Sequence, residues 1–207
     1  MKIALLGATG LTGRLVLREA TARGHHINAL ARNGASLPED GVAVHEGDIC
    51  DLDAVTRVVQ GADAVISAVG ARGRDSNLHT LLAQNTTTAM RTMGVTRFVG
   101  ISVGGLDVPG DRKGPRDRFI GALARTLAGG ASEDRRREYE IWQASGLRWT
   151  LIRVPRLTDG EPNTASAIDV HIPPRGITLH RAALASLLVE YATAEKFIEQ
   201  APFAANS

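Results

Sequence analysis

A glycine-rich segment near the start of the chain has the residue types and spacing of a phosphate-binding loop. It reads Gly7-Ala8-Thr9-Gly10-Leu11-Thr12-Gly13 and falls between an apolar run and an amphipathic stretch. Glycines at three-residue spacing let the chain turn sharply, let the backbone approach a pyrophosphate, and let the following helix pack closely. Backbone N–H groups at the helix start then face the anion. The segment predicts a dinucleotide site; the alternative is a glycine-rich structural turn.

The residue at the end of the second apolar run indicates which dinucleotide is bound. An NAD site usually has Asp or Glu there, about 20 residues beyond the glycines, to bind the ribose 2′-hydroxyl. Here Arg32 stands in that place, and a guanidinium favours a 2′-phosphate through paired, charge-assisted hydrogen bonds. We therefore predict NADPH as the cofactor, with NAD as the second option and a solvated surface arginine as the alternative. Arg14 could bind the same phosphate or lie on the helix surface.

Asp48 and Ile49 follow the third apolar run, at the edge of a parallel sheet where ligands bind. Asp48 is a candidate to accept a hydrogen bond from the adenine amine, and Ile49 to supply its main chain and an apolar edge. The alternative is a helix cap for the segment that starts near Asp51, a use that either aspartate would suit.

Catalysis by a Tyr-x-x-x-Lys pair is excluded by the positions of the lysines. In that pair the ammonium lowers the pKa of the phenol, but no tyrosine stands four residues before Lys2, Lys113 or Lys196. Hydride transfer needs no side-chain acid when the acceptor is a conjugated ring that takes its proton from solvent. We therefore expect a flavin, quinone or tetrapyrrole type of acceptor.

Three further side chains are weaker catalytic candidates, and for Tyr139 and His79 the alternative is a structural role. They are Ser102 after the fifth apolar run, Tyr139 on a predicted helix, and His79 as a proton donor. Four arginines could hold the phosphate or carboxylates of an acceptor, or could be solvated or structurally paired. These are Arg72, Arg74, Arg153 and Arg156.

Short apolar runs alternate with amphipathic segments along the first half of the chain, as in parallel strands joined by crossover helices. The predicted strands are residues 3–6, 27–31, 42–45, 64–68, 97–101 and 148–153, with one more around 167–171. The predicted helices are residues 11–23, 52–59, 78–93, 119–127, 132–144 and 180–194, and the charges of 135–140 suggest an exposed helix carrying local ion pairs. The predicted fold is α/β, a Rossmann-type doubly wound parallel sheet with helices on both faces.

Length and composition limit the domain count and the partners. The 207 residues, of which 43% are hydrophobic and 22% charged, fit a single NAD(P)-binding domain over 1–207. Glycine and proline breakers place a small substrate cleft in about 104–131 and 154–178. A net charge of +2 gives no reason to expect nucleic acid or a membrane. Cys50 is the single cysteine, so a disulfide within the chain is excluded and no metal site is predicted.

No apolar run is long enough for a signal peptide or a membrane-spanning helix, so we expect a soluble, cytoplasmic protein. We also expect a monomer or a homodimer that acts on a small molecule.

Several segments together resemble the atypical short-chain dehydrogenase/reductases. The similarity is greatest to the NmrA-like, NAD(P)H-binding branch that includes flavin reductase/biliverdin-IX-beta reductase, and it covers nearly the whole chain. The segments are 7–13, Arg32, 47–48, 67–70, 94–99, 145–153 and the tail 196–206.

The resemblance implies a set of cofactor contacts. They are Gly7, Thr9, Gly10, Leu11 and Thr12, with Gly13 in the same loop, at the pyrophosphate; Arg32 at the 2′-phosphate; Asp48 and Ile49 at adenine; Ala68, Val69 and Gly70 along the ribose; Ser102 and Val103 beside the nicotinamide; and Val154 and Pro155 at the carboxamide.

The branch contains reductases, epimerase-like enzymes and redox-sensing regulators. The resemblance therefore implies an NADPH-dependent oxidoreductase, with a non-catalytic NAD(P)-sensing regulator of NmrA type or a sugar-nucleotide epimerase-like enzyme as alternatives.

Overall fold

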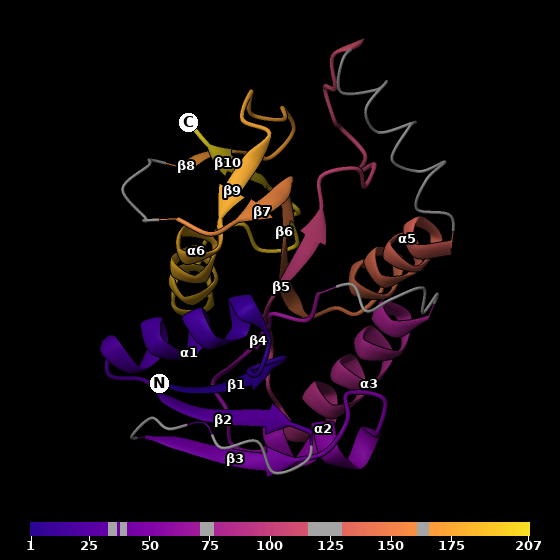
Figure 1. Cartoon of the computed structure of the whole chain (residues 1–207). Helices are drawn as coiled ribbons and strands as arrows, with labels where there is room; N and C mark the ends of the chain where they lie inside the picture. Colours follow the sequence, from indigo (N-terminus) through magenta and orange to yellow (C-terminus); the bar gives the residue numbers. More distant parts are fainter. Residues whose placement is uncertain (33–36, 38–40, 71–76, 116–129, 161–165) are drawn as a thin grey trace.

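The chain folds around one large twisted sheet, seen nearly edge-on in the computed structural model of Figure 1. The structure describes residues 1–32, 37, 41–70, 77–115, 130–160 and 166–207. The first part contains β1 (Lys2–Leu6), α1 (Leu11–Ala22), β2 (His26–Ala31), β3 (Val42–Glu46), α2 (Leu52–Val59), β4 (Ala64–Ser67), α3 (Leu78–Met93) and β5 (Arg97–Val103). The second part contains α5 (Gly130–Gln143), β6 (Arg148–Val154), β7 (Arg156–Thr158), β8 (Ser166–Asp169), β9 (Thr178–His180), α6 (Arg181–Thr193) and β10 (Phe203–Asn206).

The eight strands of this sheet follow the order β3-β2-β1-β4-β5-β6-β10-β8, and only β8 runs antiparallel to its neighbour. Because β1 lies between β2 and β4, the strand order reverses at the β1–β4 boundary, the point where open α/β sheets bind ligands. Leu6 is in register with Leu30 and with Ser67, so the carboxyl ends of these three strands meet at one edge. This topology confirms the predicted Rossmann-type doubly wound sheet.

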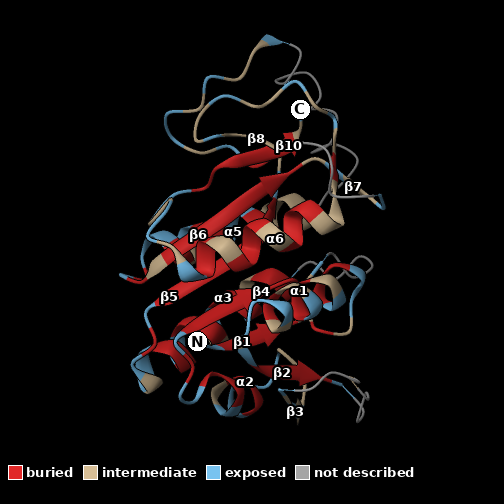
Figure 2. Cartoon of the chain, turned by 90° about the vertical axis from the view of Figure 1, so that its left-hand side faces the viewer, coloured by how far each residue is buried: buried red, intermediate tan, exposed pale blue. Residues whose placement is uncertain are grey.

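Helices cover both faces of the sheet, with α1 and α6 on one side and α2, α3 and α5 on the other (Figure 1). The strand period of two explains why both faces are apolar. In β1, Ile3 and Leu5 pack in the cluster that includes α1 and α6, whereas Ala4 and Leu6 pack in the cluster under α2 and α3. Figure 2 shows the resulting buried interior along β1, β4, β5 and β6.

The C-terminal third contains strands that the sequence did not predict. β10 joins the sheet beside β6, with Phe203 opposite Arg153, and β7 pairs with β9 in a separate two-stranded sheet. The strand expected at 167–171 is found as β8, which starts and ends earlier. The helix expected at 119–127 lies outside the described residues. β7 and β9 have three residues each, too short for a periodic pattern to show.

Helix α5 differs from the exposed helix that its charged residues predicted. Its charges were expected to be exposed, but Asp134, Arg135 and Glu138 are buried. Arg135 pairs with Glu138 at 2.8 Å and donates to the carbonyl oxygen of Ile101 at 2.9 Å. Burial raises the pKa of Glu138, against the lowering by Arg135. The exposed pairs exist as well, but on the other side of the helix, where Glu133 binds Arg136 and Arg137.

Asp134 caps a different helix from its own. Its carboxylate accepts the backbone N–H groups of His79 and Thr80, each at 2.9 Å, at the start of α3. The residue at the N-cap position of α3, Asn77, makes no side-chain cap bond of its own. Asp134 therefore satisfies N–H groups at the start of α3 and not those of its own helix.

Candidate functional site: a nucleotide cavity and an adjoining cleft

The glycine-rich segment forms a closed turn between β1 and α1. Gly7 has a φ of +83°, a conformation that favours glycine, and its carbonyl oxygen accepts the Gly10 N–H at 3.1 Å. A Cβ atom on Gly13 would lie 2.0 Å from that same oxygen, so only glycine allows the first turn of α1 to approach β1 this closely. The turn thus has the close contacts for which the glycine spacing is needed.

The start of α1 is free to bind an anion. Gly10 is its N-cap and provides no side-chain cap, and the first turn contains no acidic residue. The N–H groups of this turn therefore have no side-chain cap, and the helix dipole adds a partial positive charge there. A diphosphate fits these donors.

A cavity of about 440 Å³ opens above this turn, at the carboxyl edge of the sheet. It brings together eleven of the predicted cofactor contacts with five residues that the sequence did not single out for this role. The predicted ones are Gly7, Thr9, Gly10, Leu11, Thr12, Arg32, Asp48, Ile49, Ala68, Val69 and Gly70; the others are Leu30, Gly47, Leu78, Leu157 and Arg181. Gly13 lies beneath the turn rather than in the cavity lining.

Two arginines near this cavity differ in what they can reach. Arg32 is exposed at the end of β2, lines the cavity, and has no ion pair or hydrogen bond with another described residue. Arg14 does not line the cavity, and its Nε donates to the carbonyl oxygen of Thr9 at 3.3 Å. Of the two, Arg32 is the arginine whose side chain borders the cavity.

The structure separates the two uses considered for the aspartates after β3. Asp51 is the N-cap of α2 and accepts the Asp53 N–H at 2.9 Å. Asp48 lines the cavity, and its Oδ1 accepts the Cys50 N–H at 2.9 Å in a local turn. Asn85 on α3, which the sequence did not indicate, donates to the carbonyl oxygen of Ile49 at 2.9 Å and so fixes this segment.

A second cavity, of about 490 Å³, lies beside the first and forms a cleft. Its lining comes from the ends of β5 and β6, from the segment before β9 and from β10. The residues are Val103, Gly104, Gly105, Lys113, Arg153, Val154, Pro155, Arg156, Pro173, Pro174, Arg175, Gly176, Ile177, Phe203, Ala204 and Ala205. Val103, Val154 and Pro155 therefore line this cleft and not the nucleotide cavity. Adjacent residues of β7 line the two cavities, since Arg156 lines the cleft and Leu157 lines the nucleotide cavity.

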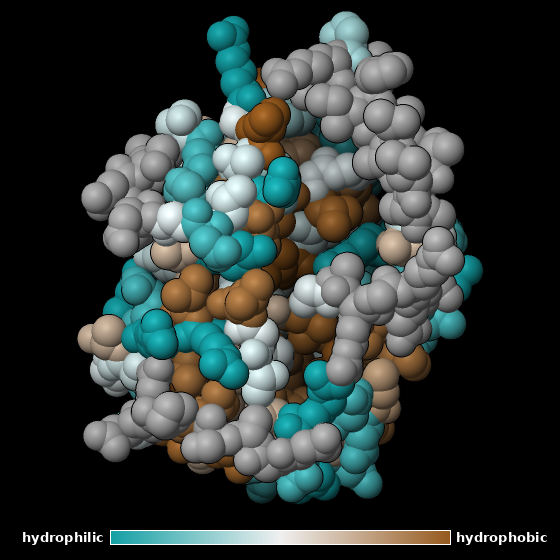
Figure 3. Space-filling view, in the orientation of Figure 1, coloured by the Kyte–Doolittle hydropathy of each residue, from teal (hydrophilic) through white to brown (hydrophobic). Residues whose placement is uncertain are grey.

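The cleft is largely apolar, with basic groups at its edges. On the face drawn in Figure 3, apolar surface is exposed in the central part, between hydrophilic residues. Ile177 is among the most exposed apolar side chains and belongs to this cleft. Its described lining includes no Asp or Glu, so it suits a ligand that is apolar in its body and negatively charged at one end.

Arg153 lines the cleft but is not available to such a ligand. It is fully buried and binds the Asp111 carboxylate with two hydrogen bonds, of 2.6 and 2.9 Å. Its guanidinium also lies 3.5 Å from the ring centroid of Phe203. Further donations go to the carbonyl oxygens of Ala201, Leu106 and Val170. Of the two roles left open for Arg153, the structure shows structural pairing.

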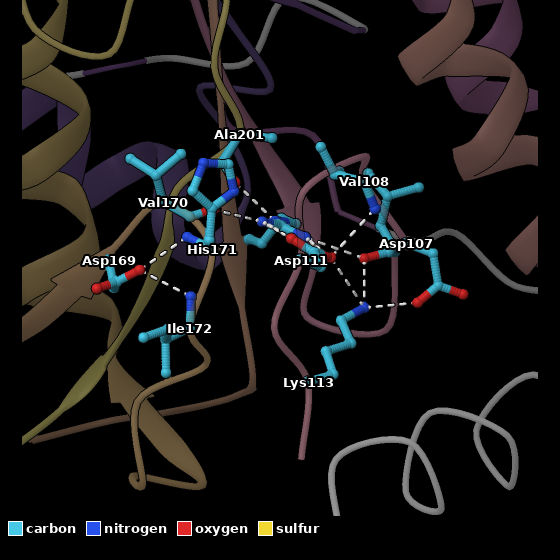
Figure 4. A network of polar contacts seen from close by, with 11 residues as sticks. Asp107, Val108, Asp111, Lys113, Asp169, Val170, His171, Ile172 and Ala201 are labelled. Atoms are coloured by element: carbon cyan, nitrogen blue, oxygen red, sulfur yellow. Dashed lines mark hydrogen bonds and ion pairs between the residues drawn. The ribbon is translucent and has the colours of Figure 1, made fainter. Parts of the chain in front are cut away.

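Lys113 belongs to the same network and binds its carboxylates and a carbonyl oxygen (Figure 4). Its ammonium donates to the Leu106 carbonyl oxygen at 2.7 Å and to Asp107 at 2.8 Å, and lies 3.4 Å from the Asp111 carboxylate. Three acceptors match the three N–H bonds of an ammonium. The cleft residues Arg156 and Arg175, by contrast, are exposed and make no ion pair with any other described residue. Arg72 and Arg74 lie outside the described residues.

The three weaker catalytic candidates lie outside the described lining of both cavities. Ser102 is 1% exposed, whereas Val103 next to it is 39% exposed, as strand alternation requires. Tyr139 packs edge-on against Trp149 in the core, and burial raises the pKa of its phenol. His79 is buried, and this burial, followed by the Arg135 charge, lowers its pKa to about 3. Their catalytic roles stay predictions.

Sequence reasoning missed Arg181, Leu157, Asn85 and Phe203 as parts of the site. Each reaches it through a contact distant in sequence, and no local motif marks any of them. Only the loop breakers and the alternation of β6 could have drawn attention to this end of the chain.

A doubly wound parallel sheet, with a glycine turn and an uncapped helix start lining a cavity at its switch point, defines a dinucleotide-binding Rossmann protein. The chain belongs to the NAD(P)H-binding family, whose model matches residues 7–195. This match confirms the NAD(P)H-binding domain that the resemblance implied.

Relatives and solved structures agree with this assignment. YwnB of Bacillus subtilis (strain 168) is 27% identical over 152 residues, 73% of this chain and 70% of that protein. The photosystem II assembly factor Ycf39 of Synechocystis is 31% identical over half of this chain, but the match spans 34% of Ycf39. ChuY, an anaerobilin reductase from Escherichia coli O157:H7, has the same fold, with a TM-score of 0.83 at 22% identity over 100% of this chain and 97% of ChuY.

Across the described residues, no helix has both the length and the apolar character that a bilayer crossing requires.

Proposed function

We propose that the protein is an NADPH-dependent reductase that passes a hydride to a conjugated, anionic acceptor bound in the cleft. The observation that carries this proposal is the shared wall at β7, where Leu157 lines the nucleotide cavity and Arg156 lines the cleft. In this proposal the nicotinamide end of a nucleotide held by the glycine turn extends past β7 into the cleft and contacts the acceptor there. Such juxtaposition is what hydride transfer requires of a protein.

Each part of the site has a task in this proposal. When bound, the reduced nicotinamide supplies the hydride. The N–H groups at the start of α1 bind the pyrophosphate, and the Arg32 guanidinium binds the 2′-phosphate. Val103 and Val154, side by side in register at the ends of β5 and β6, exclude water from the meeting point. Arg156 and Arg175 bind the negative charge of the acceptor.

The described lining of the cleft also suggests how the proton arrives. Its titratable side chains are one lysine and three arginines, and Lys113 already uses its three N–H bonds. An acceptor that takes its proton from solvent is therefore favoured over a simple ketone. Flavins, quinones and tetrapyrroles meet that requirement, and the activity named for ChuY supports including a tetrapyrrole.

The test of the reductase is the loss of NADPH absorbance with FMN, biliverdin, dichlorophenolindophenol or a small neutral quinone. We expect steady oxidation above the no-protein control with at least one acceptor. The double variant Arg156→Met/Arg175→Met should lower kcat/KM about tenfold for the anionic acceptors, which is about 1.4 kcal/mol, and leave the neutral quinone unchanged. Arg136→Met, on the exposed side of α5, is the matched control.

Nucleotide binding without turnover across the whole panel would contradict the reductase and favour an NAD(P)-sensing regulator.

The choice of NADPH has its own test. Replacing Arg32 by Asp should lower the ratio of NADPH to NADH affinity at least about tenfold, since charge-assisted bonds to the 2′-phosphate are replaced by repulsion. Arg14→Met should leave that ratio unchanged, because Arg14 does not line the cavity. An unaltered ratio in Arg32→Asp would refute the coenzyme assignment and leave the fold assignment intact.

A further inference from the structure

A second arginine reaches the nucleotide cavity from the C-terminal part of the chain. Arg181 is the first residue of α6, and its side chain is 19% exposed. It lines the cavity together with Thr9, Gly10, Leu11 and Thr12 of the glycine turn. Because α6 packs on α1, β4 and β5, Arg181 approaches from the β4 side of the turn. Arg32 approaches from the opposite side, at the end of β2.

The glycine turn itself contains no basic residue to offset a diphosphate. Gly7 to Gly13 has no basic side chain, and the helix dipole contributes roughly half an elementary charge. Arg14, the next basic residue, donates to the Thr9 carbonyl oxygen and does not line the cavity. A cation from elsewhere in the chain would add to these backbone donors at a bound pyrophosphate. Arg181 is an arginine of the cavity lining that lies on the side away from Arg32.

The present partner of Arg181 is one that a phosphate can replace. Its Nη1 lies 2.8 Å from Oδ1 of Asp159, whose side chain is 83% exposed. An ion pair with so exposed a carboxylate is weak, because solvent screens it and the side chain is free to move. A guanidinium binds a phosphate through two parallel charge-assisted hydrogen bonds, which is a stronger arrangement.

We propose that Arg181 clamps the pyrophosphate of the bound dinucleotide and leaves Asp159 when it does so. Arg32 then selects the nucleotide by its 2′-phosphate, whereas Arg181 holds every dinucleotide equally. Asp159 competes with the pyrophosphate for the same guanidinium. This assignment depends on dinucleotide binding, which defines the family, and not on turnover.

Isothermal titration calorimetry of the full chain with three probes separates the two arginines. The probes are NADPH, NADH and adenosine 2′-monophosphate, which has the 2′-phosphate but no pyrophosphate. Arg181→Gln should weaken NADPH and NADH by the same factor, about tenfold, and leave adenosine 2′-monophosphate unchanged. Arg32→Gln should weaken the binding of NADPH and of adenosine 2′-monophosphate and leave the binding of NADH unchanged.

The aspartate gives a second, independent measurement. Asp159→Asn removes the competing carboxylate and should tighten both dinucleotides about threefold. In the double variant Asp159→Asn/Arg181→Gln this gain should disappear, because the two side chains act through one ion pair. The urea midpoint of each variant checks that it is folded, and Asp159→Asn tests the proposal even where Arg181→Gln does not fold.

Three results would overturn the clamp. One is unchanged dinucleotide affinity in Arg181→Gln, and another is an equal loss for adenosine 2′-monophosphate, which would mean a general collapse of the cavity. The third is a failure of Asp159→Asn to tighten either dinucleotide. Binding that follows the expected pattern with no turnover of any acceptor would support the clamp and contradict the reductase, so the two proposals can fail separately.

Discussion

The nucleotide-binding part of the molecule, β1 to β5, and the cleft-forming part, from 104 to the C-terminus, are held together by different interactions. In the first part the site is made by backbone geometry: a positive φ at Gly7 and a close contact at Gly13. In the second part buried arginines bind carbonyl oxygens of distant segments. Arg153 joins β6 to three other segments. Arg97 of β5 links the two parts, because it donates to the carbonyl oxygens of Tyr191 and Arg148.

Because of this difference, the two parts respond differently to amino-acid substitutions. A backbone turn depends on the absence of a side chain, so one added methyl group disrupts it. A buried guanidinium depends on several acceptors together, and removing it leaves all of them unsatisfied. Burial lowers the pKa of Arg97 to about 10, which still keeps its charge at neutral pH. The cleft is therefore stabilised by charges whose partners lie far away in sequence.

The largest effect is expected from removing the cation at the centre of the cleft-forming part. Arg153→Met leaves the buried Asp111 carboxylate without its bidentate partner and should lower the free energy of unfolding by about 3–5 kcal/mol. Urea denaturation, with the slope m checked for two-state behaviour, measures it. The neighbouring exposed Arg156→Met is the control and should change stability by less than about 0.5 kcal/mol.

The double variant Arg153→Met/Asp111→Asn tests this explanation. It also removes the unpaired carboxylate charge, so it should recover part of the lost free energy of unfolding. A single variant within about 1 kcal/mol of the wild type would show that the network in Figure 4 does not stabilise the cleft.

A smaller effect on stability, but a large one on binding, is expected in the glycine turn. Gly13→Ala places a Cβ 2.0 Å from the Gly7 carbonyl oxygen, so α1 must shift, at a cost of about 2–3 kcal/mol. NADPH affinity should fall more than about tenfold, whereas Arg153→Met should retain it in the folded protein. Gly105→Ala, which has nothing within 4 Å of its added Cβ, is the matched control. Wild-type affinity in Gly13→Ala would refute the role of the close contact.

The smallest effect is a change of stability with pH at the contact between α3 and α5. There Asp134 of α5 caps α3 by accepting the backbone N–H of His79. The pKa of His79 in the fold, about 3, lies below its ordinary value of 6.5. The folded protein therefore binds fewer protons here than the unfolded chain below pH 6.5, and stability falls as the pH decreases. We expect a loss of about 2 kcal/mol between pH 8 and pH 5, which His79→Gln abolishes.

Urea midpoints across this pH range measure the effect, with the exposed His26→Gln as control. A pH dependence that persists in His79→Gln would place its origin in other groups.

The elements of the first part were predictable from sequence because each is marked locally. The bounds of α2 and α3 agree with the prediction, and those of β1 and α1 differ by one residue. Gly24, Gly61 and Gly94 follow the ends of these helices and have the positive φ that glycine favours. Arg32 could be placed at the nucleotide cavity because its distance from the glycines is set by one βαβ unit.

The second part was not predictable to the same degree, since its key contacts join residues far apart in the chain. Arg135 and Glu138 have the spacing of a surface ion pair, yet burial against β5 makes them part of the core. Nothing local distinguishes Arg153, which is buried, from Arg156, which is exposed. Both lie near the end of the same apolar run of the sequence.

The sequence alone determined the α/β class, the phosphate-binding turn and the absence of a Tyr-Lys pair, because these depend on periodicity, on glycine positions and on residue spacing. Tertiary structure decided which charges are free to meet a ligand. Arg156, Arg175, Arg32 and Arg181 line the two cavities, while Arg153 and Lys113 are committed to carboxylates and carbonyl oxygens. The physical reason is that the availability of a charge depends on the partners that folding brings to it, and those partners come from anywhere in the chain.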